Sequence, residues 1–150
     1  MDSTPQHGPD AHASVVVARN AQGDVAVLSA RFPQHGGGEY VFLPGGRQEP
    51  GETAEDCARR ELREEAGVTA ETWHHLGTYA ITLNSPALIS LYLAEGLTLG
   101  PQELKNTEAD FKLSWWLLGE AITAATEGRF LLPGGPLALL LAERVIMQRL

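Results

Sequence analysis

Acidic residues are concentrated in one segment of the chain. Seven of the 19 aspartates and glutamates fall within the 23 residues 46–68. Three of them, Glu61, Glu64 and Glu65, have the i, i+3, i+4 spacing that places side chains on one side of a helical turn. Like charges at this spacing repel, so an isolated helix gains nothing from the arrangement. The spacing therefore indicates that the three carboxylates face a positively charged ligand.

A divalent cation would turn this repulsion into a binding site. Mg²⁺ prefers oxygen ligands and keeps coordination positions for water and for substrate phosphates. Such ions could neutralise a diphosphate, polarise its phosphorus and align an attacking water. The competing interpretation is a solvated helix face, because Arg59, Arg60 and Arg63 are spaced to form ion pairs with the same glutamates.

The segment also resembles the signature of a known family. It matches every specified position of the Nudix box, which is written G-x5-E-x7-R-E-U-x-E-E-x-G-U with U a bulky aliphatic residue. The matching residues are Gly46, Glu52, Arg60, Glu61, Leu62, Glu64, Glu65, Gly67 and Val68. This resemblance implies a Nudix hydrolase, an enzyme that hydrolyses a nucleoside diphosphate linked to another group.

The resemblance implies roles within the box. Glu61, Glu64 and Glu65 resemble the ligands of the family's metal, which is Mg²⁺ with Mn²⁺ as a substitute, and one of them can instead act as the base for the attacking water. The backbone carbonyl of Gly45 is implied as a further ligand. Arg60 resembles the arginine that orients these carboxylates.

Two other residues of the segment are expected to be structural. Glu52 is expected to pair with the arginine side of the helix rather than to bind metal tightly. Cys57 is expected to be a packed residue rather than a nucleophile, because no histidine accompanies it in the sequence.

Outside the box, the chain resembles the ADP-ribose pyrophosphatase branch of the family. The resemblance rests on Ser85-Pro86, the run 91–97, Glu108-Ala109-Asp110, Trp115-Trp116 and an apolar C-terminal helix. It implies a homodimer that cleaves ADP-ribose or a related ADP-sugar to AMP and a sugar phosphate. Two alternatives stay open, a nucleoside-triphosphate pyrophosphatase that releases pyrophosphate and a domain that binds ADP-ribose without cleaving it.

Five further residues are candidates for the reaction or for substrate contact. By the same resemblance, Glu108 in the polar segment 100–110 is a catalytic glutamate, and a solvated loop acid is the alternative. Arg31 and Arg47 could meet phosphates, and Tyr40 and Phe42 could stack on a base. Core packing is the alternative for both aromatic residues, because they lie in a strand-like run.

The overall charge narrows the classes of partner. Eleven Lys and Arg residues stand against 19 acids, giving a net charge of −8. An acidic chain is a poor match for nucleic-acid backbones or anionic membrane surfaces, both of which attract basic residues. The single cysteine cannot form an internal disulfide, and no signal peptide or membrane span is recognisable. We therefore expect a soluble cytoplasmic protein with a small-molecule substrate.

A helix must position the acidic segment. Thr53 is the expected N-cap, and Gly67 is the expected stop just after Ala66. An apolar residue recurs every fourth position and supplies the buried stripe: Ala54, Ala58, Leu62 and Ala66. The helix is therefore expected to bury one face while it presents its glutamates on another.

The remaining pattern predicts an α+β sandwich. Strands are expected at 14–18, 25–30, 40–43, 73–81, 88–94 and 114–117, with the first two forming a hairpin, and helices at 120–126 and 136–150. We expect residues 1–12 to be a loose tail and residues 13–150 to be one domain. The family resemblance implies an α/β/α sandwich with a mixed, largely antiparallel sheet between helices.

Overall fold

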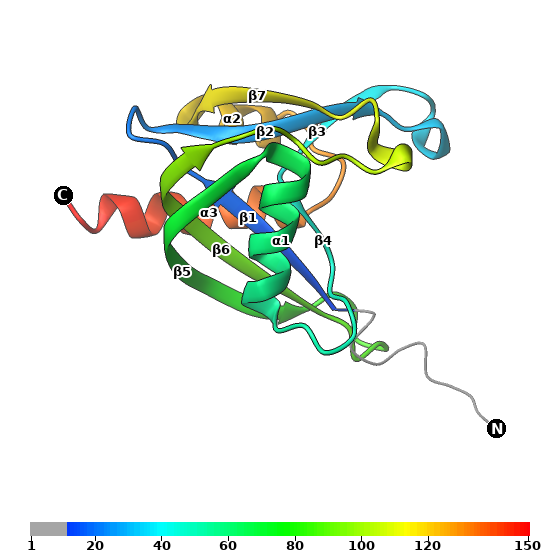
Figure 1. Cartoon of the computed structure of the whole chain (residues 1–150), viewed down its shortest axis with the longest axis horizontal. Helices are drawn as coiled ribbons and strands as arrows, with labels where there is room; N and C mark the ends of the chain where they lie inside the picture. The colour runs from blue at the N-terminus through cyan, green and yellow to red at the C-terminus, as the bar shows by residue number, and fades with distance from the viewer. Residues whose placement is uncertain (1–11) are drawn as a thin grey trace.

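The computed structural model describes residues 12–150 and forms a layered α+β structure (Figure 1). Its elements in chain order are β1 (Ala13–Ala18), β2 (Asp24–Arg31), η2 (Pro33–His35), β3 (Glu39–Phe42), β4 (Gly45–Arg47), α1 (Ala54–Ala66), β5 (Val68–Ala80), β6 (Leu88–Leu99), η3 (Asn106–Glu108), β7 (Lys112–Leu117), α2 (Leu118–Thr126) and α3 (Gly134–Met147). The tail expected over residues 1–12 lies outside the described residues, except for His12. The imidazole Nδ1 of His12 accepts a hydrogen bond from the backbone N–H of Leu88 at 3.0 Å.

The strands form two sheets. The four-stranded sheet has the order β4-β1-β6-β5, in which only β1 and β6 are parallel. The three-stranded sheet has the order β3-β2-β7 and is antiparallel throughout. The expected α+β class with mixed, largely antiparallel pairing is confirmed, and the strands are divided between two sheets rather than joined in one.

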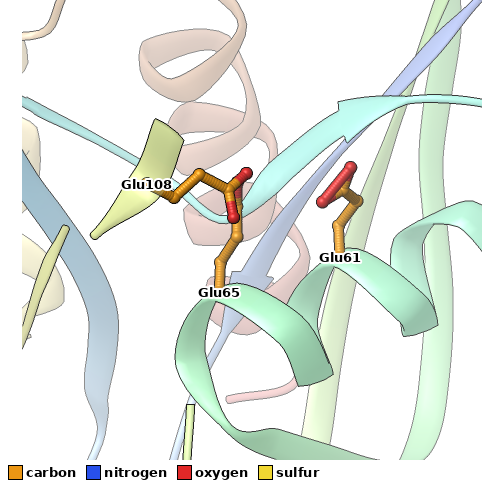
Figure 2. A group of neighbouring side chains, drawn as sticks. All are labelled: Glu61, Glu65 and Glu108. Carbon is orange, nitrogen blue, oxygen red and sulfur yellow. The ribbon is translucent and has the colours of Figure 1, made fainter. Parts of the chain in front are cut away.

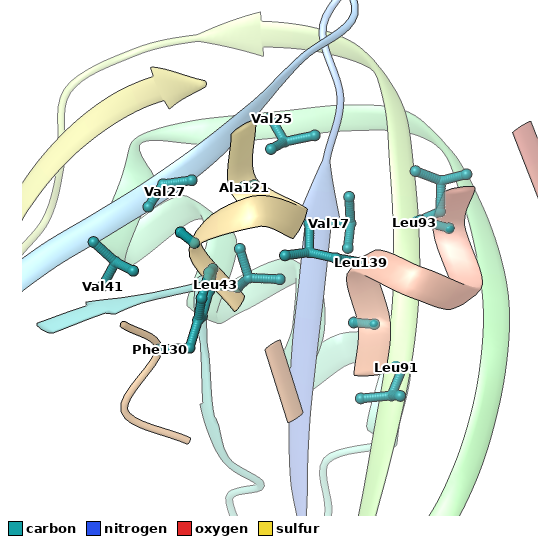
Figure 3. Close-up of a cluster of buried hydrophobic side chains, with 13 residues drawn as sticks. Val17, Val25, Val27, Val41, Leu43, Leu91, Leu93, Ala121, Phe130 and Leu139 are labelled. Atoms are coloured by element: carbon teal, nitrogen blue, oxygen red, sulfur yellow. The ribbon is translucent and has the colours of Figure 1, made fainter. Parts of the chain in front are cut away.

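Helices cover both faces of the four-stranded sheet, and the alternation of side chains along β1 shows how. Val17 packs in a cluster with Leu93 and with Leu139 of α3 (Figure 3). The adjacent Val16 packs in a second cluster with Leu62 of α1. Successive side chains of a strand point to opposite faces, so α1 lies on one face of the sheet and α3 on the other.

The predicted hairpin between the first two strands is wrong. β1 and β2 belong to different sheets, and a single bridge between Arg19 and Val25 joins them. The turn itself is present, because the Asn20 side chain accepts hydrogen bonds from the backbone N–H groups of Gln22 and Asp24. Local turn chemistry therefore predicted the reversal, whereas long-range pairing decided the partners of each strand.

Gly45 follows the expected strand 40–43 and begins a further short strand that was not expected. β4 pairs with β1, and Gly45 lies opposite Val15. A Cβ atom on Gly45 would lie 2.3 Å from the carbonyl oxygen of Ser14, so glycine permits this close approach. Strand β5 also begins five residues earlier than expected, at Val68, because its polar first half pairs with the second half of β6.

Helix α1 follows the sequence prediction. The Thr53 hydroxyl accepts a hydrogen bond from the backbone N–H of Asp56 at 3.1 Å, as expected of an N-cap. Ala58, Leu62 and Ala66 are buried. Gly67 has a φ of +69° and ends the helix, so the acidic segment is held between two well-defined caps.

We expect Gly67→Ala to lower the free energy of unfolding by about 2 kcal/mol, because the left-handed conformation is unfavourable for alanine. A Cβ atom there would also lie 2.3 Å from the carbonyl oxygen of Gly100. Urea denaturation tests this. Gly119→Ala is the control, because Gly119 lies in α2 and, within residues 12–150, nothing beyond its chain neighbours and its own helix backbone lies within 4 Å of its Cβ position. A helical Gly→Ala change there should stabilise by up to about 1 kcal/mol, and equal losses in the two variants would contradict the prediction.

Helix α3 leaves part of its apolar surface uncovered. Leu137, Leu140 and Met147 are exposed on it. The expected homodimer stays a prediction.

None of the helices within residues 12–150 combines the length and hydropathy needed to cross a membrane.

Candidate active site and metal centre

Helix α1 and the loop before β7 bring three glutamates together (Figure 2). Glu61 and Glu65 lie one turn apart on α1, and Glu108 comes from η3. One carboxylate oxygen from each residue lies within 4.8 Å of the other two. Glu61 and Glu65 are only 6% and 5% exposed. Two of the three predicted helical glutamates and the predicted loop glutamate thus form one cluster.

The surroundings of Glu65 disfavour its negative charge. Burial raises the pKa of Glu65 to about 9, and the nearby carboxylates of Glu61 and Glu108 add to the increase. The backbone N–H of Gly45 donates a hydrogen bond to Glu65 Oε1 at 2.9 Å and opposes that shift only in part. The positive charge around the Glu65 carboxylate is therefore too small to stabilise its ionised form.

The surroundings of Glu61 also disfavour the negative charge of its carboxylate. Burial raises its pKa to about 7, although the guanidinium of Arg60 opposes the increase. Its Oε1 atom is buried and has no hydrogen-bond partner among the described residues. Buried polar atoms are normally paired, so this oxygen is suited to a cation. The residues present therefore fit a divalent metal ion.

Arg60 joins the acidic residues around the cluster. Its guanidinium donates to both carboxylate oxygens of Glu52, at 2.7 and 3.0 Å, and to Glu64 Oε1 at 3.2 Å. It also lies 3.5 Å from Glu61 Oε2. The hydrogen bonds with Glu52 lower the pKa of Glu52 and raise that of Arg60. The expected pairing of Glu52 with the arginine side of the helix is confirmed.

Glu64 lies beside the cluster rather than in it. Its Oε1 atom contacts Arg60 and lies 3.8 Å from the Lys105 ammonium. Its predicted role as a metal ligand stays a prediction, as does that of the Gly45 carbonyl.

Sequence reasoning missed Lys105, which has the position to meet anionic groups at the cluster. Its only signal in the sequence was its place three residues before Glu108 in the polar loop.

A cavity of about 560 Å³ lies over the cluster and contains only one of the four predicted substrate-contacting residues. Arg47 lines it, together with Arg60 and Lys105. Arg31, Tyr40 and Phe42 are not among its lining residues. Their predicted contacts with substrate stay a prediction.

Those three residues make other contacts. Arg31 donates to the carbonyl of Gly37 at 3.1 Å, and the Tyr40 hydroxyl donates to the carbonyl of His35 at 3.2 Å. The Phe42 ring lies 4.9 Å from that of Phe111 between centroids. Packing is thus the observed role of Phe42.

Cys57 is buried beside the cavity. Its Sγ atom donates a hydrogen bond to the carbonyl oxygen of Gly46 at 3.4 Å. Burial raises the pKa of the thiol to about 11, so it stays protonated and is a poor nucleophile at neutral pH. This agrees with its predicted role as a packed residue.

We expect Gly46→Ala to weaken metal binding about 10- to 100-fold, because supporting contacts of ligands commonly change affinity by this amount. An added Cβ atom would lie 2.0 Å from Glu61 Oε2, so the carboxylate would have to move. Calorimetric titration with Mn²⁺ measures the effect. Gly38→Ala is the control, because its Cβ would make ordinary contact with Tyr40 at 3.5 Å. Equal Mn²⁺ affinity in both variants would contradict the prediction.

Solved structures show the same type of fold. A crystal structure of an ADP compounds hydrolase superposes with a TM-score of 0.77 over 92% of this chain and 74% of that one, at 19% identity. A MutT structure, from a study of Aliivibrio salmonicida and Vibrio cholerae, superposes with a TM-score of 0.58 over 75% of this chain and 83% of that one, also at 19% identity. The fold of this chain is therefore that of the Nudix-type sandwich.

The NUDIX domain model matches residues 9–132, and the chain belongs to the Nudix hydrolase family. An ADP-ribose pyrophosphatase of Mycobacterium tuberculosis is 30% identical over 118 residues, which cover 77% of this chain and 57% of that protein. An NAD-capped RNA hydrolase NudC of Chromobacterium violaceum is 32% identical over 120 residues, covering 80% and 40%. The chain thus spans about half the length of these relatives, or less.

Proposed function

We propose that this protein is a metal-dependent pyrophosphohydrolase that cleaves ADP-ribose or a related ADP-sugar to AMP and a sugar phosphate. The observation that carries the proposal is the cluster of Glu61, Glu65 and half-buried Glu108, in which one oxygen from each carboxylate lies within 4.8 Å of the other two. Buried carboxylates without matching positive charge are costly unless a cation accompanies them. The cluster lies in a cavity that also presents cationic side chains, as a diphosphate requires.

The metal we propose is Mg²⁺, with Mn²⁺ as a substitute. Glu61, Glu65 and Glu108 would hold it, and Glu64 and the Gly45 carbonyl are further candidate ligands. When bound, the ion supplies charge neutralisation and polarisation at the diphosphate. The unpaired Oε1 of Glu61 supports this assignment, because Mg²⁺ takes oxygen ligands.

The protein's own side chains then bind the substrate and accept a proton. Lys105 and Arg47 line the cavity and would contact the phosphate oxygens. Arg60 keeps Glu64 and Glu61 oriented through its contacts at 3.2 and 3.5 Å. A carboxylate oxygen among Glu61, Glu64, Glu65 and Glu108 would take the proton from the attacking water.

The choice of ADP-ribose is supported by the ADP-ribose pyrophosphatase that is 30% identical over 77% of this chain. A second candidate has support of similar strength. The relative named NAD-capped RNA hydrolase is 32% identical over 80% of this chain. An NAD-type dinucleotide has the same chemical core, an adenosine diphosphate joined to a second group, and the same cluster could serve it.

A substrate panel with Mg²⁺ and product analysis tests the proposal. We expect AMP and ribose 5-phosphate from ADP-ribose. Faster cleavage of NAD(H) to AMP and a nicotinamide mononucleotide would favour the second candidate. Activity on nucleoside triphosphates with release of pyrophosphate, and none on ADP-ribose, would contradict the proposal. So would ADP-ribose binding without cleavage.

A further inference from the structure

The segment between β6 and η3 is fastened to the C-terminal end of α1. The backbone N–H of Gly100 donates to the carbonyl of Gly67 at 2.6 Å, and that of Glu103 donates to the carbonyl of Glu64 at 2.7 Å. The last carbonyls of a helix have no partners within the helix. Residues 100–103, which we name the strap, satisfy some of these acceptors from outside.

The strap makes a third hydrogen bond to α1 through a side chain. The Gln102 amide Nε2 donates to the backbone carbonyl of Glu65 at 2.7 Å, and Gln102 is partly buried. The same Glu65 contributes its carboxylate to the metal cluster. Gln102 therefore attaches the strap directly to the backbone of one member of the cluster, six residues before another member, Glu108.

The loop that follows the strap brings the Glu108 carboxylate toward other carboxylates, which repel it when they are charged. The Glu108 carboxylate approaches two buried carboxylates, those of Glu61 and Glu65. The Glu108 Oε1 atom accepts a local hydrogen bond at 3.2 Å from the backbone N–H of Lys105, the N-cap residue of η3. This hydrogen bond fixes the shape of η3 but does not hold it to α1. Besides the ion pair of Lys105 with Glu64 at 3.8 Å, the hydrogen bonds of the strap connect this loop to α1 and oppose the repulsion.

We propose that Gln102 is a positioning residue, which holds the strap to α1 so that Glu108 reaches the cluster of Glu61 and Glu65. The inference rests on the proposed function, because it takes Glu108 as a ligand of the metal. Without the amide, the strap keeps its two backbone bonds, and Glu108 spends less time at the cluster. Metal affinity and turnover then fall together.

Gln102→Met tests the proposal, because methionine has a similar length and no donor. We expect Mn²⁺ affinity, measured calorimetrically without nucleotide, to fall about 5- to 10-fold, the size of one lost hydrogen bond. We expect kcat for ADP-ribose to fall by a similar factor, with KM changed less than twofold. Gln102→Glu, which also lacks the donor, is a second variant. Glu103→Gln is the control, because it removes only an exposed ion pair of the strap with Arg63 of α1, at 3.8 Å, and leaves the backbone hydrogen bond of Glu103.

The Glu108→Gln background separates positioning from a general structural effect. There we expect Gln102→Met to change Mn²⁺ affinity by less than twofold, because the residue through which it acts is already altered. An equal loss in both backgrounds would overturn the proposal, and so would wild-type Mn²⁺ affinity in both Gln102 variants. A wild-type protein that hydrolyses no nucleotide would contradict the proposed function instead, since Mn²⁺ binding is read separately.

Discussion

Glu65→Gln is expected to reduce metal-dependent hydrolysis about 10³-fold or more. The change removes the negative charge that Glu65 would present to a bound metal ion but keeps the size of the side chain. It also keeps an oxygen that can accept the hydrogen bond from the backbone N–H of Gly45. Loss of a metal ligand or of a general base costs two to four orders of magnitude, and 10³-fold corresponds to about 4 kcal/mol. Initial rates on ADP-ribose at saturating Mg²⁺ measure the effect.

The same substitution should leave the metal-free protein at least as stable as the wild type. The folded-state pKa of Glu65 is about 9, above the ordinary value of 4.5, so the folded state binds the proton more tightly. The stability that this tighter proton binding contributes is fully present below pH 4.5, and it is lost as the pH rises from there through about 9. In a chelating buffer, we expect the wild-type melting temperature to fall more than that of Glu65→Gln between pH 5 and 9.

Glu55→Gln is the matched control for both measurements. It lies on α1 and is paired with Arg59 at 2.7 Å, away from the cluster. It should retain wild-type activity and show the wild-type pH dependence of melting. Full turnover by Glu65→Gln would contradict the proposed role of the cluster. A Glu65→Gln protein that lost stability faster than the wild type with rising pH would contradict the raised pKa of Glu65.

Arg60→Ala is expected to destabilise the fold by about 3 kcal/mol. The Arg60 side chain is only 13% exposed and pairs with Glu52, which is equally buried. Removing one partner from a buried pair leaves an unpaired charge and costs about 3–5 kcal/mol, and the residual exposure of Arg60 argues for the lower end. Glu64 would lose its hydrogen bond as well. Urea denaturation in a chelating buffer measures the change.

Arg59→Ala provides the contrast one residue away. Its side chain is 46% exposed, and its guanidinium pairs with Glu55 and lies 5.0 Å from the centre of the Trp73 ring. Exposed ion pairs and exposed cation–π contacts contribute about 0–1 kcal/mol each, so we expect a loss of about 1 kcal/mol. Comparable losses from the two arginines would show that Arg60 is no more than a surface charge.

The parts of the site that lie on α1 were predictable because their geometry is local. The cap at Thr53, the stop at Gly67 and the shared side of Glu61 and Glu65 all follow from helix periodicity and termini. Glu64 shows the limit of that reasoning. Spacing placed it with the other two, but its contacts with Arg60 and Lys105 hold it beside the cluster.

The contacts of the substrate candidates depend on strand pairing. The sequence indicated where strands lie and not which ones pair, because pairing joins residues far apart in the chain. Tyr40 and Phe42 lie on β3, in the sheet that does not contain β4. Arg47 lies on β4, which pairs with β1 and lines the cavity. Sequence reasoning had no means to separate Arg47 from the others.

The sequence by itself determined the helix of the acidic segment, its caps, its charge and the family that it resembles, because each depends on neighbours within a few turns. Only the tertiary structure decided that Glu108 joins Glu61 and Glu65, that Lys105 lines the same cavity and that Gln102 binds the end of α1. These contacts span 37 residues or more, from Glu65 to Gln102 and beyond. They form because the strap satisfies carbonyls that the helix cannot satisfy itself.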